Sequence, residues 1–152
     1  RPILGLMQPH FIAAPRKAPY LIVMDPLFYL PIVYLGVVIG SKALLGVAMH
    51  RLGGRYNNRH PRAQQDTLTG WGARAKAAHY NSYEAWPVFA VGLVAARFGG
   101  GDDLWIHGLS LIWIGLRVIY LYAYIADFHR LRTASWCGAT LAACWLMVLP
   151  VL

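Results

Sequence analysis

Acidic residues are scarce in this sequence, which has only six Asp and Glu residues against fourteen Lys and Arg residues. Charged residues of both signs make up 13% of its 152 residues, about half the share found in soluble globular domains. Hydrophobic residues make up 58% of the chain. The composition therefore excludes an ordinary soluble domain and indicates an integral membrane protein.

Cysteine is also rare, and both cysteines, Cys137 and Cys144, lie in one apolar run. In a helix they would lie two turns, roughly 10 Å, apart, beyond the reach of about 7 Å that a disulfide allows. The histidines show no metal-ligand spacing with each other or with the cysteines, so we predict no metal site. Phosphate-binding loops, dinucleotide fingerprints and nucleophile elbows are absent as well.

The formal net charge of +8 raises the question of nucleic acid. The basic residues lie between long apolar runs rather than on a separate polar module. We therefore predict that they orient the chain in a lipid bilayer, and we expect no nucleic acid partner.

Prolines at positions 2, 9, 15 and 19 break up any helix at the start of the chain. We predict a proline-rich arm over residues 1–25 and one membrane domain over residues 26–152. The domain is expected to be all-α, a bundle of four transmembrane helices, because each apolar segment has roughly the 20 residues needed to cross the hydrocarbon core. The predicted helices cover residues 26–49, 70–98, 104–126 and 133–152.

The connections between these helices differ in charge. Residues 50–69 and 127–132 are rich in arginine, whereas the connection over residues 99–103 contains Asp102 and Asp103. Short loops rich in Lys and Arg stay on the cytoplasmic side. We therefore expect the two basic loops in the cytoplasm and both termini on the opposite side of the membrane.

The second helix carries polar residues that need a partner or a purpose inside a membrane. Arg74, Asn81 and Glu84 are separated by seven and three residues, which places them along one helix face. That face could bind a zwitterionic ligand, with Glu84 accepting from an ammonium and Arg74 donating to a carboxylate. The same spacing also fits a clamp in which Glu84 pairs with an arginine of a neighbouring helix.

Arg117, Tyr120 and Tyr124 share one face of the third helix, and Arg132 lies at the boundary of the fourth. The tyrosines alone could form an interfacial aromatic belt, but a belt does not require the deeper Arg117. We expect Arg117 inside the bundle. Arg132 is interpreted either as one more cytoplasmic arginine or as a cation that stabilises a bound anion.

These residues carry a family resemblance. The segments that carry it are Tyr56-Asn-Asn-Arg-His-Pro-Arg-Ala-Gln64, residues 74–89 with their Arg-Asn-Glu pattern, Arg117-Val-Ile-Tyr120, and Tyr124 with Arg132-Thr133. Over roughly residues 27–152 the chain resembles a bacterial-type branch of MAPEG, the membrane-associated proteins in eicosanoid and glutathione metabolism. The resemblance implies a homotrimer in a bacterial inner membrane, with glutathione bound between neighbouring subunits toward the cytoplasm.

The resemblance also assigns roles to single residues. It implies that Arg74, Asn81 and Glu84 hold the tripeptide together with Arg117 and Tyr120. It implies that Arg132 activates the thiol with Tyr124 beside it, and that Arg51 reaches the ligand from a neighbouring subunit. One position departs from the family pattern, because many members have a second arginine where this chain has Ala77.

The function implied is a glutathione-dependent membrane transferase or peroxidase that acts on lipophilic electrophiles arriving from the bilayer. The alternative is a non-catalytic membrane subunit, in which the same residues join helices and the chain stabilises a larger membrane protein complex. Ala77 favours the alternative, because the site has one cation fewer.

Overall fold

The computed structural model describes residues 25–152, so the predicted arm lies outside the described residues except for Asp25. The described part is helical throughout its regular structure and contains no strand, which confirms the all-α prediction. Its elements are α1 (Pro26–Leu52), α2 (Pro61–Asp66), α3 (Gly70–Phe98), α4 (Asp103–Ile125), α5 (His129–Val148) and the 3-10 turn η1 (Leu149–Val151).

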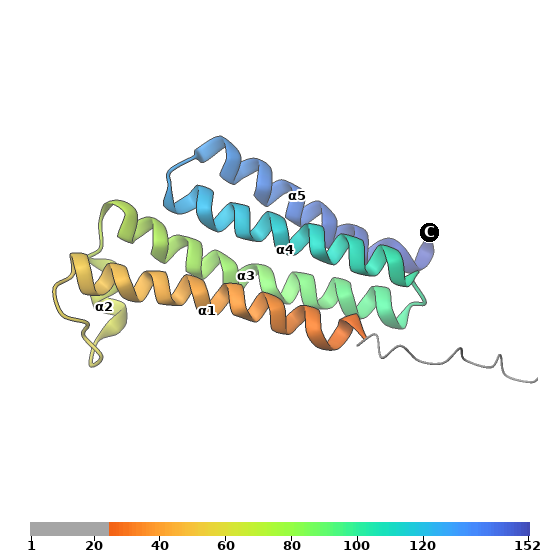
Figure 1. Cartoon of the computed structure of the whole chain (residues 1–152), viewed down its shortest axis with the longest axis horizontal. Helices are drawn as coiled ribbons and strands as arrows, with labels where there is room; N and C mark the ends of the chain where they lie inside the picture. The colour runs from red at the N-terminus through yellow and green to blue at the C-terminus, as the bar shows by residue number, and fades with distance from the viewer. Residues whose placement is uncertain (1–24) are drawn as a thin grey trace, which may run out of the picture.

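The four long helices run alternately up and down in one elongated bundle (Figure 1). α1 packs mainly on α3, α4 packs mainly on α5, and α3 also contacts both α4 and α5. The connection that holds α2 and the link between α4 and α5 lie at the same end of the bundle. We call it the basic end, because its connections and adjoining helix turns carry Arg51, Arg55, Arg59, Arg62 and Arg130.

A layer of aromatic rings forms the centre of the core. The Trp113 ring from α4 stacks on Phe89 from α3, with ring centroids 4.1 Å apart. The Tyr34 ring from α1 meets Trp113 edge-on at 4.4 Å. All three side chains are buried, so this layer fixes the spacing of three helices.

Three segments are long and apolar enough to cross a membrane, namely Pro26–Leu52, Asp103–Ile125 and His129–Val151. The remaining long helix, α3, has 29 residues and packs against all three of the others. Many large apolar side chains remain exposed on the outside of the bundle, among them Phe28, Ile32, Leu111 and Leu141. Such a surface fits a hydrocarbon solvent.

The first predicted connection, residues 50–69, is wrong in part. α1 continues to Leu52, and the six-residue helix α2 forms inside the predicted loop.

The sequence of α2 explains its start. Pro61 stands in its first turn, where the missing N–H costs nothing. The Gln64 side-chain amide donates to the backbone carbonyls of Met49, Gly53 and Arg55. A helix this short has no apolar period to reveal it, so the sequence analysis missed it.

The second basic connection, residues 127–132, is also shorter than predicted. α5 begins at His129 rather than at Thr133. The Arg132 N–H donates to the Phe128 carbonyl at 2.9 Å, which closes the first helical turn. Asp127, with φ 68°, makes the reversal at the end of α4. Arg132 is therefore a helix residue with a fixed direction, four positions before Trp136.

Asp25 joins two helices at the end of the bundle opposite the basic end. Its carboxylate accepts from the Leu27 N–H at 2.9 Å and from Arg97 Nε at 2.8 Å. The hydrogen bond from Leu27 and then the contact with Arg97 hold the pKa of Asp25 below its usual value. The carboxylate thus caps α1 and joins it to the last turn of α3.

Because the folded-state pKa of Asp25 is lowered, its contribution to stability is complete above the unfolded-state pKa and disappears as the pH falls through the folded-state value. We expect Asp25→Ala to lower the Tm of the detergent-solubilised protein by about 2–4 °C at pH 7, the effect of losing a cap worth about 1 kcal/mol. The difference from wild type should begin to shrink below about pH 4 and should close below the folded-state pKa of Asp25. Thermal unfolding of both proteins at a series of pH values measures this, and a difference that stays constant down to pH 3 would contradict it.

Candidate functional site

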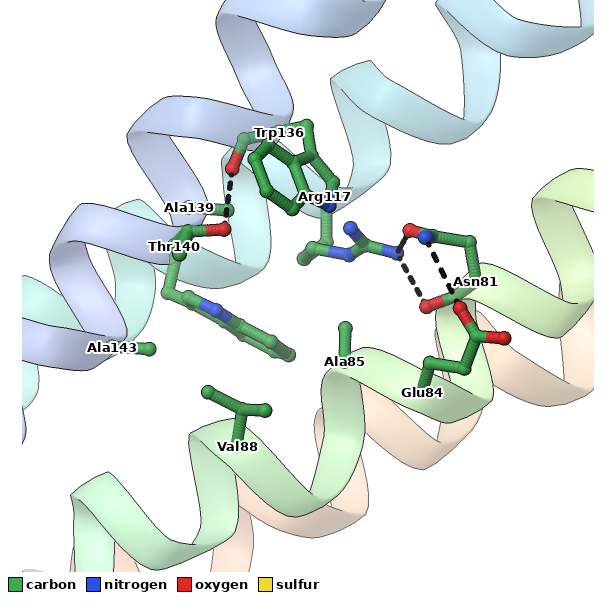
Figure 2. Close-up of a pocket in the computed structure, with 10 residues that line it drawn as sticks. Asn81, Glu84, Ala85, Val88, Arg117, Trp136, Ala139, Thr140 and Ala143 are labelled. Carbon is green, nitrogen blue, oxygen red and sulfur yellow. Dashed lines mark hydrogen bonds between the residues drawn. The ribbon is translucent and has the colours of Figure 1, made fainter.

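A cavity of about 210 Å³ opens between α3, α4 and α5 (Figure 2). Its charged and amide side chains come from α3 and α4, and α5 contributes Ala139, Ala143 and Trp136 to its apolar wall. The lining residues include Asn81, Glu84, Val88, Arg117, Trp136 and Thr140.

Arg117 is the buried cation of this cavity, with 2% of its surface exposed. Its Nη2 donates to the Asn81 carbonyl at 3.0 Å and to Asn81 Oδ1 at 2.9 Å, as Figure 2 shows. Its Nε donates to the Tyr34 hydroxyl at 3.3 Å, and that hydroxyl donates to the Ser82 carbonyl at 3.0 Å. A guanidinium has five N–H groups. The two on Nη1 have no hydrogen-bond partner within residues 25–152.

Asn81 and Glu84 lie one helical turn apart on α3. The Asn81 amide Nδ2 donates to Glu84 Oε2 at 3.4 Å, and the Glu84 side chain is exposed at the mouth of the cavity. No Lys or Arg nitrogen in the described part of the chain lies within 4.0 Å of the Glu84 carboxylate. Within one subunit, the structure therefore does not contain the predicted clamp between Glu84 and an arginine.

A second cavity, of about 260 Å³, adjoins the first toward the basic end. It is lined by Tyr120, Tyr124, Arg132, Thr133 and Trp136. Trp136 lines both cavities, so we treat them as one feature and call it the α4/α5 groove.

Each arginine of the groove lies over a tyrosine ring. The Arg117 guanidinium is 4.4 Å from the centre of the Tyr120 ring, and the Arg132 guanidinium is 4.5 Å from the centre of the Tyr124 ring. The two rings meet edge-on, with centroids 5.5 Å apart. Tyr120 is buried rather than facing lipid, so an interfacial belt does not describe it.

Arg132 has no carboxylate within 4.0 Å and no side-chain hydrogen bond to residues 25–152. Its guanidinium lies over the Tyr124 ring, and its N–H groups are available to an anion. The groove thus combines two guanidinium groups with one carboxylate, that of Glu84. Its polar groups suit a ligand that carries more negative than positive charge.

The sequence model of the MAPEG family matches residues 27–152, almost all of the described chain. The chain belongs to the MAPEG family. Together with the three apolar spans, this membership makes it an integral membrane protein of a family associated with glutathione and eicosanoid metabolism. Comparison with curated proteins and with solved structures gave no significant match.

Two predicted ligand contacts of this MAPEG chain lie away from the groove. Arg74 Nε donates to the Ile125 carbonyl at 3.1 Å, and its Nη1 lies 3.4 Å from Asp127 Oδ2. Arg74 therefore joins the start of α3 to the end of α4 and does not line the groove within one subunit, and its contact with a ligand stays a prediction. Arg51 is exposed in the last turn of α1, outside the groove, so a contact from a neighbouring subunit stays a prediction.

The sequence analysis missed the residues that complete the groove of this MAPEG chain. Trp136 and Thr140 follow Arg132 at intervals of four, a spacing that places all three on one face of α5. That signal was available in the sequence. Tyr34 gave no such signal, because it lies in a long apolar helix far along the chain from Arg117. No group of three or more potential metal ligands occurs among residues 25–152.

Proposed function

We propose that this MAPEG protein is a glutathione-dependent membrane transferase or peroxidase that acts on lipophilic electrophiles. The observation that carries the proposal is the α4/α5 groove, in which Glu84, Arg117 and Arg132 all present charged atoms without a charged partner in the described chain. Unpartnered charges are costly in a membrane protein, so a complementary ligand is the physical reason for keeping them.

The charged groups of the groove that lack a charged partner in the described chain can each be paired with one group of glutathione. The tripeptide carries two carboxylates, one ammonium and one thiol. Glu84 can accept from the ammonium, and Arg117 Nη1 can donate to a carboxylate. Arg132, which lies over the Tyr124 ring, remains for the thiol or the second carboxylate. With two guanidinium groups and one carboxylate, the groove has the charge opposite to that of the ligand.

Glutathione supplies a thiol as nucleophile, and the protein must favour the thiolate form of that thiol. A thiol with a pKa near 8.5 is only a few per cent ionised at pH 7, and lowering that pKa by about two units requires roughly 2.7 kcal/mol of preferential stabilisation. One arginine in a partly dry groove, assisted by a tyrosine hydroxyl, can provide this. Arg132 and Tyr124 are the pair that we assign to it.

The apolar wall of the groove, formed by α3 and α5, explains why the second substrate would be lipophilic. Val88 and Trp136 line the groove and are exposed on the outside of the bundle, where lipid is expected. An apolar electrophile dissolved in the bilayer could therefore reach the groove without crossing water.

The groove also favours a homo-oligomer. Both of its cavities open onto the surface of the subunit, so a single subunit does not enclose a ligand in the groove. A neighbouring copy could close the groove and bring Arg51 to it, which is the arrangement of the trimer that we propose. The basic end would face the cytoplasm of a bacterial inner membrane.

The second candidate, a non-catalytic membrane subunit, also has an observation in its favour. Arg117 joins α4 to α1 and α3, and Arg74 joins α3 to α4, so two of the buried or half-buried arginines already act as links between helices. If the remaining charges contact another membrane protein instead of glutathione, the groove would be an interface.

Glu84→Gln separates the two candidates. If Glu84 binds the ammonium of glutathione, the variant should bind glutathione about tenfold more weakly, since a hydrogen bond to a charged group contributes about 1.5 kcal/mol or more. Its Tm should stay that of wild type, because Glu84 is exposed and has no cationic partner in the described chain. Titration calorimetry on the detergent-solubilised protein measures the affinity.

N-acetylated glutathione, which lacks the ammonium, is the matched ligand control. It should bind wild type and Glu84→Gln equally. Equal affinity of both proteins for glutathione itself would overturn the assignment of Glu84. A complete lack of glutathione binding by wild type would favour the non-catalytic subunit.

A further inference from the structure

A separate cavity of about 550 Å³ lies on the other side of α3, between α1, α2 and α3 at the basic end. Its α3 residues include His79 and Tyr83, which at 100° per residue lie on roughly the opposite face of the helix from Asn81. It shares no lining residue with the α4/α5 groove. Within one subunit, it is therefore a different site from the one proposed for glutathione.

Lys42 is the feature of this cavity that requires an explanation. It lies in the membrane-spanning helix α1, ten residues before Leu52, or about 15 Å along the helix axis from its end. No carboxylate within residues 25–152 lies within 4.0 Å of its ammonium group. An ammonium at this depth is costly without an anionic partner, and its side chain can extend toward the headgroup layer to meet one.

A second cation lines the same cavity and is held in place by hydrogen bonds. Arg62, from α2, donates through Nη1 to the Tyr80 hydroxyl at 3.0 Å, and that hydroxyl donates to Gln65 Oε1 at 2.9 Å. Gln65 is 3% exposed, so the chain of hydrogen bonds is anchored in the protein interior. Arg62 has no carboxylate partner in the described part of the chain, which leaves its remaining N–H groups for a ligand.

His79 adds an acceptor beside the two cations. The Ser41 hydroxyl lies 2.6 Å from the Val38 carbonyl and 2.8 Å from His79 Nδ1. A carbonyl only accepts, so the single Ser41 proton goes to Val38 and the Nδ1–H of His79 donates to Ser41. In the neutral ring, Nε2 is then left as an acceptor, and His79 is part of the cavity lining.

From this geometry we propose that the cavity between α1, α2 and α3 binds a phosphate-containing anionic group that also carries a hydroxyl, supplied by the headgroup of a phospholipid. Lys42 and Arg62 bind the phosphate, and His79 Nε2 accepts from the hydroxyl. The depth of Lys42 in α1 favours a lipid over a phosphate dissolved in water.

The experiment uses the full chain in a non-ionic detergent and measures Tm while one additive at a time is titrated. Phosphatidylglycerol, with a phosphate and headgroup hydroxyls, should raise the Tm of wild type by about 5 °C or more when it is well above its dissociation constant. Phosphatidylcholine should give almost no shift. Phosphatidylmethanol, which keeps the charge but lacks the headgroup hydroxyl, should give a smaller shift than phosphatidylglycerol.

Variants assign the effect to the cavity. Lys42→Gln should lose most of the phosphatidylglycerol shift, whereas Arg130→Gln, which removes an exposed cation at the same end outside the lining, should keep it. Inorganic phosphate that stabilised wild type as well as the lipid, and lost this effect in Lys42→Gln, would keep the site and make soluble phosphate its source.

Two results would overturn the proposal. One is a phosphatidylglycerol shift that is equal in wild type and Lys42→Gln. The other is a loss of oligomer in Lys42→Gln together with no lipid effect on wild type, which would assign Lys42 to a contact between copies of the chain.

Discussion

Arg132→Ala is expected to lower the rate of glutathione conjugation at pH 7 by about 20-fold or more. If Arg132 lowers the thiol pKa by about two units, its loss returns the thiol to a pKa near 8.5, and the thiolate fraction falls from most of the bound molecules to a few per cent. The rate of the variant should then rise as the pH is increased toward 8.5, whereas the rate of wild type should already be level. Turnover of a chlorodinitrobenzene electrophile, followed as a function of pH, measures both effects.

Arg130→Ala is the matched control, because Arg130 is an exposed arginine two positions earlier in the first turn of α5 and does not line the groove. It should keep the wild-type rate and the wild-type pH profile. A low rate for Arg132→Ala that did not recover at higher pH would assign Arg132 to binding rather than to thiol activation. Full activity of Arg132→Ala at pH 7 would refute the catalytic assignment.

The helical bundle and the main polar face of the site could be predicted from the sequence because both depend on helical periodicity. A spacing of three between Asn81 and Glu84, or between Arg117 and Tyr120, places two side chains on one face wherever the helix lies. Arg117 had to turn inward because a charge in an apolar helix requires partners. The structure shows it buried, with hydrogen bonds to Asn81 and Tyr34.

Periodicity does not say which neighbouring helix a face meets, so the partners of Arg74 could not be predicted from the sequence. Arg74 shares its helix face with Asn81, but two turns separate them along α3, and Asp127 of the α4–α5 link is the group that Arg74 meets. The start of α5 was placed too late because polar residues were interpreted as a loop. His129, Arg130 and Arg132 are polar and yet helical, since at the end of a membrane helix they can face water or headgroups.

α3 has a double role that its composition already indicated. It carries more charged residues than any other long helix, and its two faces lead to different cavities. Asn81 and Glu84 lie toward the α4/α5 groove, and His79 and Tyr83 lie toward the cavity beside α1. Charges at one face are thus separated from those at the other by the body of the helix. A ligand at one site could change the other only by moving α3 itself.

Arg117→Met is expected to cost the most stability of any single substitution considered. Methionine keeps much of the side-chain length but leaves the Asn81 side-chain oxygen and the Tyr34 hydroxyl without the donor that they have in wild type. A buried acceptor left without its donor costs about 1–3 kcal/mol, so the two together should cost about 2–6 kcal/mol. For a chain of this size that corresponds to a fall in Tm of roughly 10 °C, measured by thermal unfolding in detergent.

Tyr34→Phe is the graded control for Arg117→Met. It removes only the hydroxyl that accepts from Arg117 Nε and donates to the Ser82 carbonyl, while the ring keeps its place against Trp113. It should lower Tm by about 3 °C, the effect of losing about 1 kcal/mol of hydrogen bonding. If Arg117→Met unfolded no earlier than Tyr34→Phe but failed to bind glutathione, Arg117 would serve the ligand alone, and the link that it makes between α1, α3 and α4 would contribute little to the fold.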